Sequence, residues 1–146
     1  MTENEYRAVL HDTLKRHTEA ALDMIFQIKI NLPEKAEAVE FGIHPSQDED
    51  GLFSVMVHLC GPDLYVLNKA IEKYRELFDA KFIEGELQPN VPVFDLEGVS
   101  FSVNDVIVGV GVDWINTLWG LSGGLGIPGY AFGEECSTTG SVPLGK

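Results

Sequence analysis

Apolar side chains recur through the first thirty residues at the spacing of one helical face. The members of this stripe are Tyr6, Leu10, Leu14, Ala21, Ile25, Ile28 and Leu32. Thr2 and Glu5 have the spacing of a capping box, which marks a helix start. Pro33 disfavours the helical conformation at the residue before it and therefore ends the helix. The pattern predicts one long helix over about residues 3–31, in which His17 interrupts the apolar stripe.

After Pro33 the pattern becomes typical of strands. Residues 39–44 and 52–60 are rich in β-branched and aromatic side chains, and an acidic, turn-forming stretch lies between them. We expect a hairpin with a wide acidic tip.

A second helix is predicted over about residues 62–79. Pro62 suits the first helical position, and Asp63 suits the positive end of the helix dipole. The apolar stripe consists of Leu64, Leu67, Ile71, Tyr74 and Phe78. Residues 81–101 contain several glycines and prolines, which predicts irregular structure with at most a short strand at 82–84.

The segment from residue 101 to 114 fits two structures. Its β-branched run favours a buried strand, whereas Asn104 is a good N-cap and the apolar residues that follow keep helical spacing up to Gly123. We predict a helix over about 105–121. Gly109 and Gly111 would each cost this helix about 1 kcal/mol relative to alanine, which indicates that another element packs closely there.

Residues 127–144, with turn residues at 136–140, predict a second hairpin. The element order is then α-ββ-α-(β)-α-ββ, without βαβ alternation. This order predicts an α+β fold with an antiparallel sheet built from two hairpins and covered by about three helices. A length of 146 residues suits a single domain over 1–146.

The charge of the chain bears on the kind of partner that the protein could bind. The formal net charge is −13 and the isoelectric point is near 4.5, while 45% of the residues are hydrophobic. Such a chain folds, yet it carries more negative charge than solubility requires. The excess is either a neutral habit of the source organism or a field directed at a basic protein partner. Only 10 residues are Lys or Arg, too few and too scattered for direct nucleic-acid binding. Most of the negative charge lies in residues 1–98.

The sequence also predicts a cytoplasmic location. The acidic N-terminus lacks the features of a secretory signal. Cys60 and Cys136 have no CxxC spacing, which indicates reduced thiols. Glycines and Pro128 interrupt the long uncharged run at 114–133, so we expect no membrane span.

The acidic tip is a candidate binding site. Asp48, Glu49 and Asp50 could contact a basic partner, and their oxygens would also suit a hard cation. The alternate ligand spacing of a calcium loop is missing. We therefore interpret the tip as a solvated turn that is available to a partner, and we expect no metal.

His44, His58 and Cys60 fall on the two strands of the first hairpin, where His58 and Cys60 share one face. They could bind zinc or form a Cys–His pair. No further ligand pair and no orienting Asp or Asn accompany them, so a half-buried histidine and a core cysteine is our interpretation. Gly109 and Gly111 do not complete a dinucleotide motif, because the third glycine position is Trp114. We expect no cofactor.

The low-charge C-terminal region could instead line a pocket. Its candidate residues are Trp114, Tyr130, Glu134 and Glu135, together with His58 from the first hairpin. Adjacent carboxylates on a strand point to opposite faces, so one glutamate at most would serve a given site. This region carries the alternative function, a small-molecule enzyme or ligand-binding domain in which Glu134 or Glu135 is a general base.

Three segments, at 44–48, 61–68 and 132–135, together resemble a family of small acidic bacterial proteins of unknown function. The resemblance implies a single bacterial cytosolic domain and supplies no catalytic residue. In size and charge alone the chain is also similar to immunity proteins, which neutralise basic toxin domains. Our leading hypothesis is a non-catalytic protein-binding module such as an immunity-like inhibitor of a basic partner. A homodimer formed through the uncharged segment is a third hypothesis.

Overall fold

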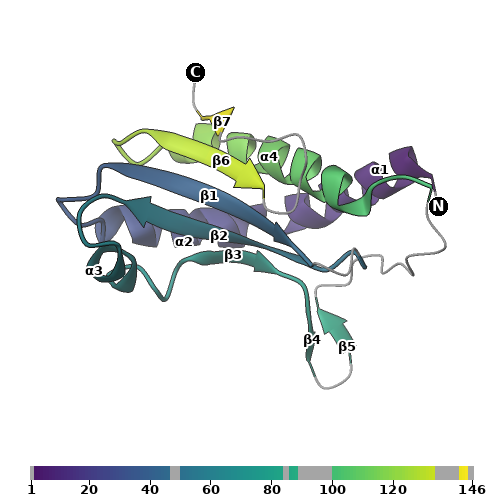
Figure 1. Ribbon diagram of the computed structural model, residues 1–146, viewed down its shortest axis with the longest axis horizontal. Coiled ribbons are helices and arrows are strands. Elements are labelled where there is room, and N and C mark those ends of the chain that lie inside the picture. The colour runs from purple at the N-terminus through teal and green to yellow at the C-terminus, as the bar shows by residue number, and fades with distance from the viewer. Residues whose placement is uncertain (1, 47–49, 84–85, 89–99, 134–141, 145–146) are drawn as a thin grey trace.

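The computed structural model describes residues 2–46, 50–83, 86–88, 100–133 and 142–144. They form an α+β fold in which a mixed five-stranded sheet carries α1, α2 and α4 on one face (Figure 1). The elements are α1 (Glu3–Arg16), α2 (Thr18–Ile30), β1 (Ala38–Pro45), β2 (Phe53–Cys60), α3 (Leu64–Lys69), β3 (Glu76–Asp79), β4 (Lys81–Ile83), β5 (Glu86–Gln88), α4 (Val103–Ser122), β6 (Gly129–Gly133) and β7 (Val142–Pro143). The α+β prediction is confirmed.

The strand order is β3-β2-β1-β6-β7, and β4 and β5 form a separate two-stranded sheet. The strand pairs of both predicted hairpins are present, since β1 pairs antiparallel with β2 and β6 pairs antiparallel with β7, while the turn predicted at 136–140 lies outside the described residues. However, β1 and β6 are parallel, with Val39 opposite Gly129 and Ile43 opposite Gly133. The prediction of a wholly antiparallel sheet is therefore wrong. Parallel neighbours need a long crossover, and the connection that includes α4 supplies it.

The predicted first helix is broken into α1 and α2 at His17. The backbone of His17 leaves the helical region, with φ of −97° and ψ of 2°, and its N–H bonds to the carbonyl of Leu14. Around this point the side chains of Thr13 and Thr18 donate to backbone carbonyls one turn earlier, at 2.8 and 3.3 Å. Such back-bonding bends helices, which explains the break.

The predicted helix over 62–79 is wrong beyond its first turns. The helix α3 ends at Lys69, and residues 76–79 form β3 at the edge of the sheet. The Asn68 side chain accepts from the Leu59 N–H at 2.8 Å and donates to the Leu59 carbonyl at 3.2 Å, which ties α3 to the end of β2. Phe78 then lies buried opposite Val55 in the sheet. An apolar residue at position 78 satisfies the helical stripe and the strand equally, so periodicity alone could not separate them.

The prediction of a helix near 105–121 is confirmed by α4, although its N-cap is Ser102 rather than Asn104. The close packing expected at the two glycines is found at one of them. A Cβ atom on Gly111 would lie 2.9 Å from Cγ1 of Ile43 in β1. At Gly109 the nearest atom is the tip of Arg7 at 3.5 Å, an ordinary contact.

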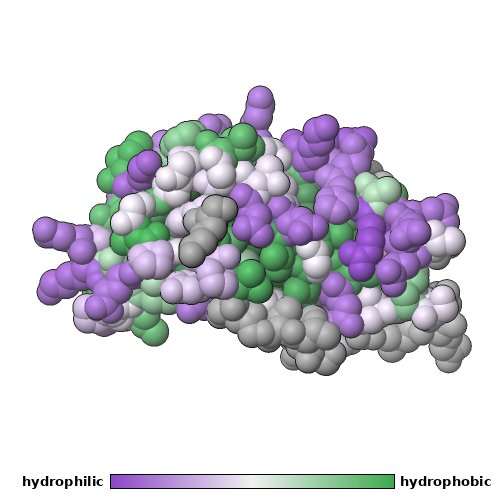
Figure 2. Space-filling model, turned by 90° about the horizontal axis from the view of Figure 1, so that it is seen from above, coloured by the Kyte–Doolittle hydropathy of each residue, from purple (hydrophilic) through white to green (hydrophobic). Residues whose placement is uncertain are grey.

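One continuous core fills the space between the helices and the sheet. In β2 the side chains alternate strictly between buried and half-buried along the whole strand. The buried side chains of β1 and β2 face the helices, as the contact of Phe41 in β1 with Trp119 in α4 at a centroid distance of 5.9 Å illustrates. Seen from the α4 and β7 side, hydrophilic residues gather toward both ends of the molecule and hydrophobic residues reach the surface between them (Figure 2).

Candidate functional site

The side of the sheet turned away from α1, α2 and α4 carries a concentration of functional side chains, and we call it the polar face. Strand alternation puts every second residue of β1, β2 and β6 on this side. Its half-buried members are Glu40, His44, Ser54, Met56, His58, Cys60, Tyr130 and Phe132. The register places Glu40 of β1 between His58 of β2 and Tyr130 of β6.

A chain of hydrogen bonds crosses the polar face from Arg75 to His44. Arg75, which precedes β3, bonds through Nη2 to Nδ1 of His58 at 2.8 Å. Its Nε donates to the Val57 carbonyl at 2.8 Å, which fixes the plane of the guanidinium. Nε2 of His58 lies 3.2 Å from Nε2 of His44. The three side chains therefore form one connected unit.

The chemistry of Arg75 determines the proton positions along this chain. A guanidinium is always charged and only donates, so Nδ1 of His58 accepts. A neutral His58 then carries its proton on Nε2 and donates to Nε2 of His44. The proton of His44 is consequently on Nδ1. In this arrangement both imidazoles are neutral, and Arg75 provides N–H donors at its end of the unit.

Three rings converge over Gly42 in the middle of β1. The centroid of Phe132 is 5.8 Å from that of His44 and 5.9 Å from that of His58. A Cβ atom at Gly42 would lie 2.6 Å from Nε2 of His44 and 2.7 Å from Cζ of Phe132. Only glycine lets the two rings lie this close to the strand. The result is an aromatic platform, which we define as His44, His58 and Phe132 over Gly42.

Cys60 is held as a neutral thiol on the same face. Its Sγ donates to Oε1 of Glu40 at 3.3 Å. Burial, followed by this bond and the charge of Glu40, raises the pKa of the Cys60 thiol to about 11. The thiolate is the nucleophilic form, so Cys60 is unreactive near neutral pH. The arrangement does not provide a Cys–His nucleophile.

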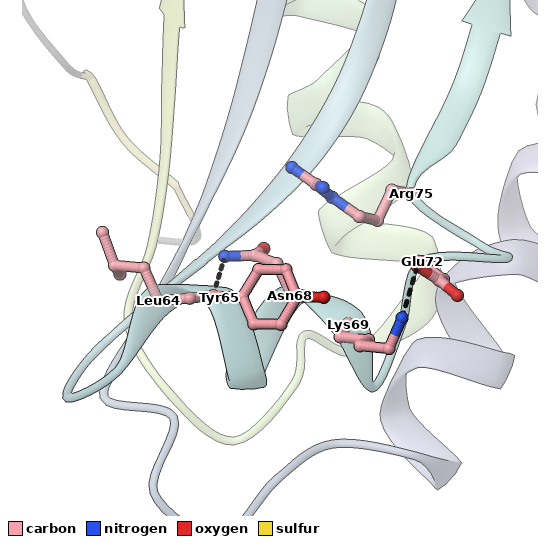
Figure 3. Close-up of a pocket in the computed structure, with 6 residues that line it drawn as sticks. All are labelled: Leu64, Tyr65, Asn68, Lys69, Glu72 and Arg75. Atoms are coloured by element: carbon pink, nitrogen blue, oxygen red, sulfur yellow. Dashed lines mark hydrogen bonds and ion pairs between the residues drawn. The ribbon is translucent and has the colours of Figure 1, made fainter.

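A hollow of about 310 Å³ lies beside the polar face, between α3 and the start of β3 (Figure 3). It is lined by Leu64, Tyr65, Asn68, Lys69, Glu72 and Arg75. Leu64 and Tyr65 project outward with exposed fractions of 57% and 73%. Lys69 Nζ lies 3.8 Å from Oε2 of Glu72. Arg75 both lines the hollow and bonds to His58, so it links the hollow to the polar face.

The structure brings together two of the residues predicted for a pocket, His58 and Tyr130, which both lie on the polar face. Trp114 does not join them. It is buried on the helix side, where its Nε1 donates to Oγ1 of Thr18 at 3.1 Å and its ring borders a separate hollow of about 290 Å³. Glu134 and Glu135 lie outside the described residues.

The candidate acidic tip is described only at Asp50. Asp48 and Glu49 lie outside the described residues. The Asp50 side chain is half-buried, and its Oδ1 accepts from the Leu52 N–H at 3.0 Å. At this position the carboxylate shapes the local turn.

Sequence reasoning missed Arg75 because the predicted helix over 62–79 placed it away from the hairpin. Sequence reasoning also did not single out Phe132, whose ring lies beside those of His44 and His58. A strand prediction at 76–79 would have aligned β3 with β2 and brought Arg75 to His58. The signal was the pair of adjacent apolar residues Leu77 and Phe78, which suits a short buried strand.

Within the described part of the chain, no group of three or more His, Cys, Asp or Glu side chains is placed to hold a metal ion. In the same residues, no helix combines the length and the apolar character that a bilayer crossing requires.

Comparison with known proteins gives a family and no further likeness. No curated protein and no solved structure matches the chain. Nothing in these comparisons shows a resemblance to immunity proteins, so that hypothesis rests on size and charge alone. The model of DUF6389, described as a family of unknown function, matches residues 1–141. The chain therefore belongs to this family of unknown function, DUF6389.

Proposed function

We propose that the protein is a non-catalytic binding module and that it receives a small ligand on the polar face of its sheet. The observation that carries this proposal is the hydrogen-bonded series of three side chains on this face. Arg75 Nη2 lies 2.8 Å from His58 Nδ1, and His58 Nε2 lies 3.2 Å from His44 Nε2. Convergent polar groups beside aromatic surface are typical of ligand sites. The aromatic platform offers ring faces and edges against which a planar group can pack.

Binding is favoured over catalysis by the protonation pattern of the same residues. Both nitrogens of His58 are engaged, one with Arg75 and the other with His44. A general base needs an available lone pair within reach of the substrate proton. The thiol of Cys60 is protonated as well. The alternative enzyme, with Glu134 or Glu135 as base, predicts that Glu134→Gln or Glu135→Gln removes an activity that His58→Gln also removes.

The test uses benzamide, a neutral planar probe, in an NMR titration of amide signals. We expect shifts in β1, β2 and β6 of the wild type. Gly42→Ala should abolish them, because its Cβ would displace the rings of His44 and Phe132. Gly120→Ala is the matched control, since nothing lies within 4 Å of a Cβ at that position. Unchanged shifts in Gly42→Ala, or shifts confined to the helices, would refute the proposal.

A second candidate is capture of a basic protein, which the net charge of −13 favours. Exposed carboxylates lie along the first two helices at Glu3, Glu5, Asp12, Glu19 and Asp23. Complementary charge chiefly raises association rates, and salt screens it. A partner recovered at low salt and released at high salt would support this function, whereas salt-independent recovery would contradict the electrostatic basis.

A further inference from the structure

Arg75 is a half-buried cation that has no carboxylate partner among the described residues. Its two hydrogen bonds go to a carbonyl and to a neutral imidazole, so no carboxylate of the described residues compensates its positive charge. The chain has 23 acidic residues against 10 basic ones, and an arginine would readily find a carboxylate on such a surface. An uncompensated guanidinium at the edge of a hollow is therefore a specific feature of this position.

We infer that the ligand of the polar face is a small carboxylate with an apolar body, and that its carboxylate binds Arg75 in the hollow beside α3. This inference rests on the proposed function and gives the ligand its chemical class. A guanidinium has five N–H groups, and the bonds to Val57 and His58 leave three of them. Two parallel N–H bonds to one carboxylate are the preferred geometry of arginine recognition.

The rest of the lining fits the same ligand. Leu64 and Tyr65 supply exposed apolar surface next to Arg75, which suits an apolar or aromatic body. A volume of about 310 Å³ lies at the small end of known ligand pockets. Arg75 presents N–H donors, so the ligand has to supply acceptors.

The charge of the whole protein favours a carboxylate over a phosphate. A net charge of −13 repels every anion, so binding depends on short-range contacts with Arg75. A phosphate monoester carries about −1.5 to −2 charges at pH 7, against one for a carboxylate, and is therefore repelled more strongly. Glu72 adds to this repulsion from within the lining, although Lys69 lies beside it.

The experiment compares benzoate with benzamide, which has the same ring without the charge, and with inorganic phosphate. Amide shifts of the wild type give the dissociation constants. We expect benzoate to bind about tenfold more tightly than benzamide, and phosphate more weakly than benzoate. Shifts should appear around Tyr65 and Asn68 as well as in β1, β2 and β6.

Variants assign the effect to Arg75. Arg75→Gln should remove the preference for benzoate, and Arg75→Lys should restore only part of it, because lysine keeps the charge but loses the planar fork. Arg16→Gln is the matched control, since it removes the same charge from an exposed position on α1. Glu72→Gln should strengthen benzoate binding about twofold. This variant changes an exposed side chain, so the prediction holds even if the Arg75 variants do not fold.

The outcomes separate the two proposals. Equal binding of benzoate and benzamide on the polar face would overturn the carboxylate assignment and leave the polar face as the site. Benzoate shifts restricted to α3 would overturn the polar-face function and leave Arg75 as an anion site. Phosphate binding as tight as that of benzoate would overturn the choice of a carboxylate with an apolar body.

Discussion

The two faces of the five-stranded sheet are built from the same strands but held by different forces. On the helix side the alternate residues of β1 and β2 are buried against α1, α2 and α4, and apolar burial fixes their positions. On the polar face the intervening residues are half-buried, and hydrogen bonds and ring contacts fix them. The comparison separates the residues that make the fold from those available for binding.

The strongest way to break this comparison is to remove the same side chain from each face. Phe41 is 1% exposed and contacts Trp119 on the helix side, so Phe41→Ala should lower the free energy of unfolding by about 3–5 kcal/mol. Phe132 is half-buried on the polar face, and Phe132→Ala should cost only about 1 kcal/mol. Urea unfolding measures both. Equal losses would show that the polar face belongs to the core.

Glycines of α4 sharpen the comparison on the helix side. Gly111→Ala forces a Cβ against Ile43, and overpacking of about 1–3 kcal/mol should outweigh the gain in helix propensity of about 1 kcal/mol. Gly109→Ala and Gly120→Ala meet no close neighbour, so each should stabilise the protein by up to about 1 kcal/mol. Thermal unfolding of the three variants checks the opposite signs. A stabilising Gly111→Ala would mean that α4 and β1 are not in close contact.

The smallest effect concerns the reactivity of Cys60 on the polar face. The pKa of its thiol is raised to about 11, so alkylation by iodoacetamide should be slow at pH 8 and rise with pH until about 11. Glu40→Gln removes a carboxylate that stabilises the neutral thiol and should lower this midpoint. Alkylation rates are measured in a Cys136→Ser background, so that Cys60 is the only thiol that can react. A midpoint that Glu40→Gln leaves unchanged would assign the whole shift to burial.

The raised pKa of the Cys60 thiol also makes the free energy of unfolding depend on pH. The pKa of Cys60 is higher in the folded protein than in the unfolded chain, where it is about 8.5. The stabilisation from the neutral thiol is therefore fully present below pH about 8.5 and is lost as the pH rises toward 11.

Sequence patterns predicted the elements in which one periodicity continues along the segment, and for α4 the helical spacing up to Gly123 outweighed the strand-like run at 101–114. The β1–β2 hairpin, α4 and the β6–β7 pairing were found this way, and His58 was placed on the face where it lies. Local hydrogen bonds of polar side chains determine where the wrongly predicted helices break or end. Thr13, His17 and Thr18 break the first helix, and Asn68 ties down the end of α3.

The candidate site was predicted only in part for a related reason. His58 and Tyr130 were expected in one pocket and share the polar face, whereas Trp114 serves the opposite side. Their joint placement depends on the parallel β1–β6 pair, which connects positions far apart in the chain and leaves no local signal. Arg75 needed a correct β3 to be recognised.

The parallel pair also has a consequence for how the molecule forms. Residues 39–43 find their neighbours at 129–133, with α3, β3 and α4 in between. Contacts of such large sequence separation slow folding, because a long loop must close before they contribute. During synthesis the β1–β2 hairpin therefore exposes a strand edge until β6 arrives. This edge is the natural place for a chaperone to bind, or for two unfinished chains to pair wrongly.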